Sequence, residues 1–191
     1  MGTLIFGVLL ALTLFWGVGA HNRLMRLRSV VRDQWVVVDA AWIKLLVPLQ
    51  GSLAARLVQD GDTAHDVALE VALDAPALAQ ACEQLLDALT QARQQPLDAS
   101  RVQGVLQARR ALMDKIVGIL ARDKGQAWPE LVSLQLRLWQ NLPALVGQYH
   151  QAVEVYHEAI ETRPARWLAQ RLGLTHVQRL DEMVVGLELG A

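Results

Sequence analysis

Apolar residues recur every three or four positions along most of this chain, which is the spacing of one face of an α-helix. The first row consists of Leu24, Leu27, Val31, Trp35, Val38, Trp42, Leu45, Leu49, Leu53 and Leu57. Three further rows are Leu78, Cys82, Leu85 and Leu89; Val102, Leu106, Leu112, Ile116 and Leu120; and Leu138, Leu142, Leu145, Tyr149, Val153, Tyr156 and Ile160. The pattern predicts an all-α protein whose long helices alternate in direction and bury these rows in an antiparallel four-helix bundle.

Turn and capping residues set the expected bounds of the four helices. We expect them at about residues 3–59, 63–92, 99–122 and 129–162. The first would end at the turn Asp60-Gly61-Asp62, the third would be capped by Lys124-Gly125, and Pro129 suits a first helical turn. A proline inside a helix removes one backbone hydrogen bond, which predicts a kink at Pro48, a break at Pro76 and a weak point at Pro143.

The segment from Thr3 to Ala20 contains no charged residue, and as a helix it would extend ~27 Å, close to the ~30 Å thickness of bilayer hydrocarbon. A cleaved signal peptide is the alternative, because Val18-Gly19-Ala20 resembles a cleavage site. A secretory signal carries its positive charges before the apolar run, whereas here Arg23, Arg26, Arg28 and Arg32 follow it. We therefore expect residues 1–20 to be an uncleaved transmembrane anchor.

The same arginines predict the orientation, because cationic flanks stay on the cytoplasmic side of a membrane. The short N-terminus would lie outside and the helices inside, in a single-pass protein of the bacterial inner membrane. Trp16, Arg23, Arg26 and Arg28 are the expected membrane-interface residues on this side of the chain.

The stretch YHQAVEVYHEAIETRP, residues 149–164, repeats a Tyr-His pair after seven residues. His150, Glu154, His157 and Glu161 would share one helix face, and Glu154-Val155-Tyr156-His157 matches the Glu-x-x-His element of di-iron bundles. A di-iron centre needs a second such element, and the sequence has none. We therefore expect Tyr149 and Tyr156 to be buried, and the His and Glu side chains to be solvated or to flank the seam, without a metal.

The last part of the chain, residues 163–191, is expected to form a basic amphipathic helix and a tail, distinct from the bundle at 21–162. Its arginines occur with no acidic residue before Asp181. Arg166, Trp167 and Arg171 are the candidate contacts with lipid headgroups. The alternative is a short helix that caps the open end of the bundle.

Composition excludes several kinds of chemistry. The formal net charge is -1, which disfavours nucleic acid as a partner. The one cysteine, Cys82, cannot form an internal disulfide and lies in an apolar row. There is no glycine-rich phosphate loop, no Gly-x-Ser-x-Gly and no His-Glu-x-x-His motif. We expect a protein without catalytic residues, cofactor or metal.

Asp39 lies near the apolar row, and we interpret it as a paired polar residue that fixes helix register.

Motifs in both halves of the chain resemble those of the LemA family. Leu27, Arg28, Val31, Trp35 and Asp39 are similar to its Leu-Arg-x-x-Val-x-x-x-Trp-x-x-x-Asp helix, which follows a membrane segment. Ala127-Trp128-Pro129-Glu130-Leu131 is similar to its Ala-Tyr-Pro-Asp-Leu. The spacing of Tyr149, Val153, Tyr156 and Pro164 resembles its Tyr-Asn-x-x-Val-x-x-Tyr-Asn and terminal proline, with histidine in place of asparagine.

The resemblance implies an N-terminally anchored antiparallel helical bundle and supplies no catalytic residues. We therefore expect a membrane-anchored scaffold or interaction module that organises partners at the bacterial membrane. Its partners would be the lipid bilayer and other proteins, a second copy of the chain included. The alternative is a bundle that senses a ligand or metal, or, less favoured, an enzyme.

Overall fold

The computed structural model describes residues 1–59, 66–123 and 128–180, and these residues form five helices and no strand. The helices are α1 (Gly2–Gln59), α2 (Asp66–Gln94), α3 (Ala99–Asp123), α4 (Pro129–Glu161) and α5 (Ala165–Arg171). The all-α prediction is confirmed, and the bounds of the four long helices agree with those expected to within about three residues. The expected turns at Asp60-Gly61-Asp62 and Lys124-Gly125 lie outside the described residues.

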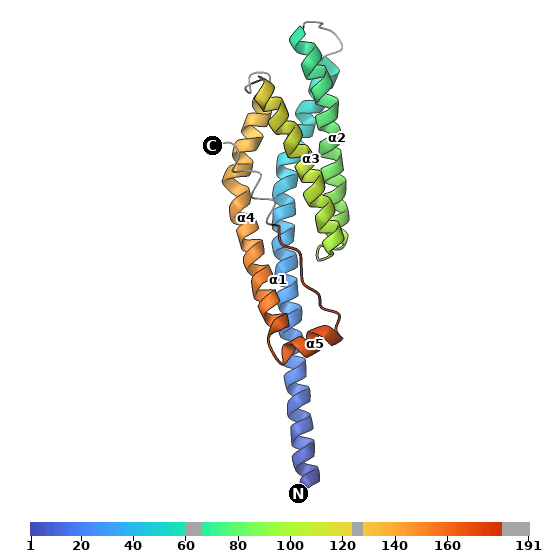
Figure 1. Ribbon diagram of the computed structural model, residues 1–191, viewed down its shortest axis with the longest axis vertical. Helices are drawn as coiled ribbons and strands as arrows, with labels where there is room; N and C mark the ends of the chain where they lie inside the picture. The colour runs from blue at the N-terminus through green and yellow to red at the C-terminus, as the bar shows by residue number, and fades with distance from the viewer. Residues whose placement is uncertain (60–65, 124–127, 181–191) are drawn as a thin grey trace.

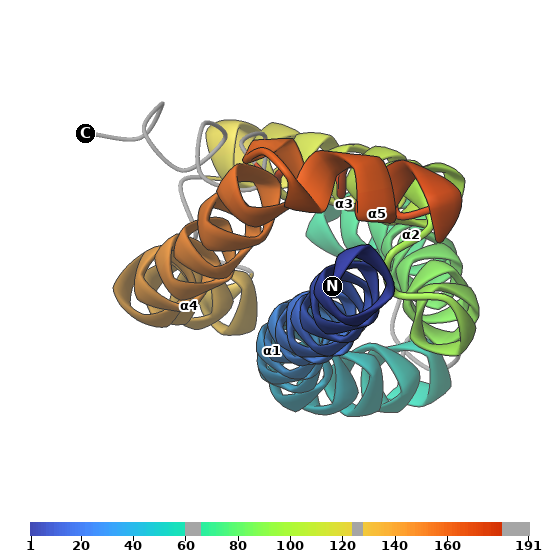
Figure 2. The ribbon, with the colours of Figure 1, turned by 90° about the horizontal axis from the view of Figure 1, so that it is seen from below.

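The longest helix, α1, organises the molecule. It contacts α4, α2 and α5, while α3 packs mainly against α2 and makes few contacts with α4. Seen along the long axis, α1 lies between α4 and α2 (Figure 2). The N-terminal part of α1 projects alone beyond the other helices, and α5 lies across α1 where this projection begins (Figure 1).

The three internal prolines do not interrupt their helices. Pro48 lies within α1, Pro76 within α2 and Pro143 within α4, and each helix is continuous. The expected break at Pro76 is therefore wrong. Its neighbours Ala75 and Leu78 are both fully buried in the core, so packing along α2 offsets the one backbone hydrogen bond that the proline removes.

The core consists largely of the apolar rows read from the sequence. Of these residues, Leu27, Leu45, Leu120 and Leu145 are partly buried, and the other described members are buried. The side chain of Leu57 lies outside the described part. The rows omitted Leu46, Val105 and Val146, which are also buried. Leu46 is buried because α1 packs against α2 on one side and α4 on the other, which requires a wider apolar stripe than one contact does.

The chain turns back after α5, which the sequence did not lead us to expect. The Leu174 N–H donates to the Ala169 carbonyl (2.9 Å) and the Gly173 N–H to the Gln170 carbonyl (3.3 Å), the two bonds of a Schellman motif. Gly173 has φ +63°, the left-handed conformation that this motif requires. Residues 174–180 then run without helix or strand. We call residues 174–180 the C-terminal strap.

Candidate functional site

The start of α1 has the composition of a membrane-spanning segment. Within Gly2–Arg56 an 18-residue stretch is long and apolar enough to cross a membrane, and none of it is buried inside the protein. It is the one such helix among the described residues, and it lies at the N-terminus, where signal sequences share this composition. Its large side chains, Leu4, Ile5, Phe6, Leu12 and Phe15 among them, are mostly exposed.

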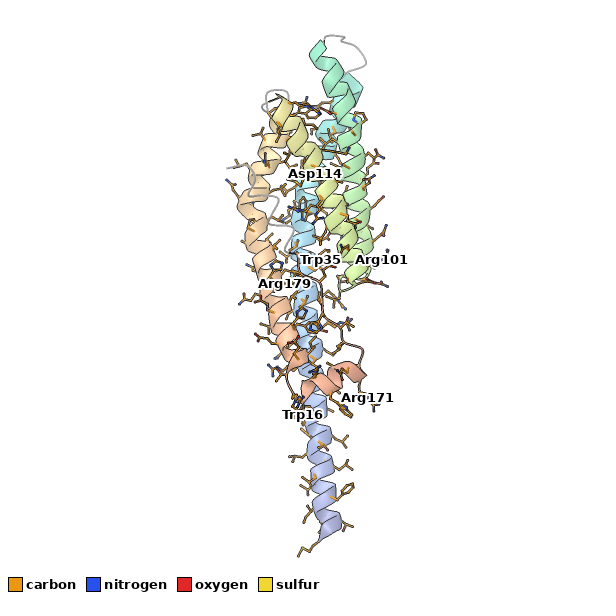
Figure 3. The ribbon with its side chains drawn as sticks, viewed as in Figure 1. Trp16, Trp35, Arg101, Asp114, Arg171 and Arg179 are labelled. Carbon is orange, nitrogen blue, oxygen red and sulfur yellow. The ribbon has the colours of Figure 1, made fainter. Side chains whose placement is uncertain are left out.

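The structure brings the two groups of predicted interface residues to one level of the molecule. A cleft of about 450 Å³ lies between α1, the end of α4 and α5. It is lined by Trp16 and Arg23 from α1 and by Arg163 and Ala165 from the α4–α5 region. Figure 3 shows Trp16 on α1 and Arg171 on α5 near this junction. Arg26 is exposed and Arg28 is half-buried, farther along α1.

The short helix α5 packs on the protein with one side and exposes cationic and aromatic groups on the other. Ala169 is buried and Leu168 partly buried against the core. Trp167 is 67% exposed, and the Arg171 guanidinium lies 5.3 Å from the centre of its ring. Arg166 is also exposed. The geometry thus combines features of both sequence interpretations, the cap and the interfacial helix.

Each Tyr-His pair on α4 binds the backbone of the C-terminal strap. The Tyr149 hydroxyl donates to the Gln178 carbonyl (2.9 Å), and the Leu180 N–H donates to His150 Nε2 (2.9 Å). The second pair repeats this: the Tyr156 hydroxyl donates to the Thr175 carbonyl (3.3 Å), and the Val177 N–H donates to His157 Nε2 (3.0 Å). We call Tyr149, His150, Tyr156 and His157 the Tyr-His face.

The two histidines flank the buried seam, which is one of the two expected alternatives, but their contacts with the strap were not expected. Both rings are half-buried, and each accepts a backbone hydrogen bond from the strap. The strap covers this side of α4 with Val177 and Leu180 buried in the core. Sequence reasoning missed it because the contacts join positions 20 to 30 residues apart; the repeated Tyr-His pair itself was the available signal.

Two exposed glutamates of this stretch, Glu154 and Glu161, also bind the strap. The Arg179 guanidinium donates to Glu154 (2.7 Å), and His176 Nε2 lies 2.8 Å from Glu161 Oε1. Each carboxylate thus has a different partner instead of converging with the histidines. Among the described residues there is no group of three or more His, Cys, Asp or Glu side chains placed to hold a metal ion.

Burial shifts the pKa values of Tyr149, Tyr156 and His157. It raises the pKa of both tyrosines, so their hydroxyls remain donors, although the charge of Arg28 partly opposes the shift at Tyr156. The pKa of His157 is lowered, chiefly by burial and then by His176, whose ring centre lies 4.7 Å away. The hydrogen bond from His176 lowers the pKa of Glu161.

The remaining motif residues have structural contacts. Trp35 is buried and packs edge-on against Tyr149, with ring centres 6.0 Å apart. Asp39 is 5% exposed and accepts hydrogen bonds from Arg93 of α2, at 2.5 Å from Nε and 3.3 Å from an amino nitrogen. Pro129 begins α4 and Pro164 directly precedes α5. Arg93 was not singled out from the sequence, although it is the basic residue in the last turn of α2.

Other clefts lie between helices at the surface. One of about 650 Å³ between α2 and α3 is lined by polar side chains, including Gln84, Asp87 and Arg101. Another of about 440 Å³ adjoins the Asp39–Arg93 pair, next to Val36 of α1. Cys82 is buried, and burial together with Glu83 raises its thiol pKa to about 12, so the thiol is protonated and unreactive.

Comparison with family models, with curated proteins and with solved structures found no match to this chain. The class of protein therefore follows from the structure of the described residues alone. Over residues 1–59, 66–123 and 128–180 the chain is a helical protein with one candidate membrane-spanning helix, at the N-terminus.

Proposed function

We propose that this protein is a membrane-anchored helical scaffold that organises partner proteins at the cytoplasmic surface of a bacterial membrane, similar to a divergent LemA-family protein. The observation that carries the proposal is the continuity of α1. The same helix that provides the unburied apolar stretch continues to Gln59 as the helix against which α2, α4 and α5 pack. Anchor and packed helices thus have no flexible linker between them, so the helical part would keep a fixed position relative to the bilayer.

We propose further that α1 to α4 constitute an antiparallel four-helix bundle. The support is that α1 packs with α2 and α4, that α2 packs with α3, and that their apolar rows contribute to one hydrophobic core. The paucity of contacts between α3 and α4 leaves that side of the bundle the least closed.

A scaffold needs a surface for its partners, and we assign it to one side of α1. Val30, Val37 and Val47 are 40%, 43% and 55% exposed, although they lie on the helix at the centre of the molecule. Val36, which precedes Val37 in α1, is 54% exposed. We call these four residues the open valine face. Apolar side chains gathered on an exposed helix face favour contact with an apolar helix, from another protein or from a second copy.

Photocrosslinking in cells tests this function. A photoreactive amino acid would be placed in the full chain at Val37 or Val47, and, as the matched control, at Val117 of α3, which is 49% exposed. We expect one or a few discrete crosslinked species in the membrane fraction from positions 37 and 47 and not from 117. A crosslink to the same chain identifies a homo-oligomer. No crosslink from the open valine face, or the same pattern from position 117, contradicts the proposal.

A further inference from the structure

The C-terminal strap is held through its backbone by groups whose spacing matches it. The two Tyr-His pairs are seven residues apart on α4, which corresponds to ~10.5 Å along the helix. Their partners are three residues apart on the strap, Thr175 and Gln178 for the tyrosines and Val177 and Leu180 for the histidines. Three extended residues span ~10 Å. The two pairs therefore make the same contacts with the strap at positions three residues apart, and the strap runs antiparallel to α4.

The two histidines can accept these backbone hydrogen bonds in only one protonation state. A backbone N–H donates to Nε2 in each case, so Nε2 must carry a lone pair and the neutral ring must have its proton on Nδ1. A protonated imidazole is a donor at both nitrogens and has no acceptor. Protonation would place two N–H groups against each other at each point and leave the amides of two buried residues, Val177 and Leu180, without their acceptors.

The tyrosine contacts are insensitive to this change, and so is most of the core. Burial keeps both hydroxyls protonated, and their acceptors are carbonyls. Histidine is the side chain whose charge ordinarily changes between pH 5 and pH 8. Two of the hydrogen bonds that hold the strap, those to the histidines, would therefore be lost at mildly acidic pH. The two from the tyrosines would remain.

We propose that the C-terminal strap is a proton-controlled cover: protonation of His150 and His157 releases residues 174–180 from α4 and uncovers the Tyr-His face. Release would expose the apolar positions filled by Val177 and Leu180 together with the hydroxyls of Tyr149 and Tyr156. The control lies in the fold itself and requires no ligand other than the proton.

Charged groups around the histidines modify this response without reversing it. Glu161 of α4 favours a proton on His157, while His176 and Arg179 of the strap disfavour it. Arg28 of α1 acts at the neighbouring Tyr156, and Arg166 of α5 acts at Glu161. Near His150, the described charged pair is Glu154 with Arg179. Glu161 and His176 also pair with each other, but both side chains are more than half exposed, so water screens this interaction.

The direction of the pH dependence follows from the lowered pKa of docked His157. A base whose pKa is lower when docked than when free contributes to docking in full above its free pKa, about 6.5. This contribution decreases as the pH falls below that value and is lost as the pH approaches the docked pKa. By pH 5 an imidazole with a free pKa near 6.5 weakens docking by up to ~30-fold.

Hydrogen exchange at the amides of Val177 and Leu180 tests the proposal on the full chain in detergent micelles. Rates at pH 8 and pH 5, each divided by the intrinsic rate at that pH, give the protection of the strap. We expect protection to decrease at least ~10-fold at pH 5, while amides in the middle of α4 keep theirs. Protection that is the same at both pH values overturns the proposal.

Three variants distinguish the proposed cause from others. The double variant His150→Gln and His157→Gln keeps an acceptor without a titrating group, so its protection should not depend on pH. His176→Gln removes the imidazole that pairs with Glu161 and should respond like the wild type. Tyr156→Phe should lower protection at both pH values and preserve the fold-change between them.

An unchanged pH response in the double glutamine variant overturns the proposal. Loss of the pH response in His176→Gln also overturns it. If the double variant does not dock at pH 8, His157→Gln alone decides: a smaller fold-change supports the proposal and an equal one overturns it.

Discussion

Tyr149 and Tyr156 combine two roles that the sequence pattern does not separate. Both rings are almost fully buried in the seam of α4, which the apolar row predicted. Both hydroxyls also reach carbonyls of the C-terminal strap, which the row could not predict. A residue of this kind contributes apolar contact area and a hydrogen bond to a distant segment, so shortening it affects two parts of the molecule together.

Replacing Tyr156 separates the two contributions. Tyr156→Phe removes only the hydrogen bond to Thr175 and should cost about 1 kcal/mol of unfolding free energy. Tyr156→Ala also removes a buried ring and should cost ~3 kcal/mol or more. Thermal or denaturant unfolding measures both. Equal costs for the two variants would contradict burial of the ring.

A solvated His157, as one sequence interpretation has it, predicts that His157→Ala is almost neutral, whereas its contact with the strap predicts a loss of stability. The substitution leaves the N–H of the buried Val177 without its acceptor, which costs about 1–3 kcal/mol at neutral pH. The matched control is His21→Ala, at a half-buried histidine on α1. Unfolding at pH 7.5 compares them, and equal small effects would contradict the contact.

The carboxylate of Asp39 is buried, whereas its partner Arg93 has a side chain that is 45% exposed. Asp39→Ala removes the ion pair between α1 and α2 but leaves an arginine that water can reach. We therefore expect the free energy of unfolding to fall by about 1–3 kcal/mol, less than for a fully buried pair. Asp33→Ala, at an exposed position on the same helix, is the matched control and should change stability by less than about 0.5 kcal/mol. Denaturant unfolding distinguishes them, and similar values would rule out a register-fixing role.

At the scale of elements, the long helices could be read from the sequence and the strap could not. Helix bounds follow from local information: apolar spacing, Pro129 at a first turn and turn residues at the ends. The strap depends on two histidines and two tyrosines on α4, and on Gly173 turning the chain back after α5. None of these contacts is local, and nothing in the apolar pattern of residues 174–180 specifies where that segment docks. At Pro76 the local rule that a proline breaks a helix gave a wrong prediction, because buried residues on both sides of it pack in the core.

The exposed side of α5 allows a test of membrane contact. We expect the chain from residue 21 onward to bind weakly to anionic vesicles, because Arg166 and Arg171 attract the headgroups and Trp167 inserts at the interface. Binding should be lost at high salt and in the triple variant Trp167→Ala, Arg166→Glu and Arg171→Glu. Co-sedimentation measures it. If the triple variant binds as well as its parent, or neither binds at low salt, α5 is only a cap.

At the scale of the whole molecule, its elongated shape matches a protein that stands on a membrane. α1 has 58 residues, or ~87 Å of helix, of which the first part projects without partners. α4 runs back to the level where the projection begins and delivers α5 beside Trp16 and Arg23. The cationic and aromatic groups from both ends of the chain therefore gather in one layer, next to the segment apolar enough to span a bilayer.

This layer predicts a topology. All four arginines nearest the apolar segment follow it, and α5 with its arginines lies at the level of the first of them, Arg23, so these arginines lie on the side of the packed helices. Because positive flanks are retained in the cytoplasm, the C-terminus should be cytoplasmic. A C-terminal alkaline phosphatase fusion, active only in the periplasm, should remain inactive, and a green fluorescent protein fusion should fluoresce. Strong phosphatase activity would contradict this topology. The mature chain should also keep its full mass, since loss of about 20 residues would identify the segment as a cleaved signal peptide.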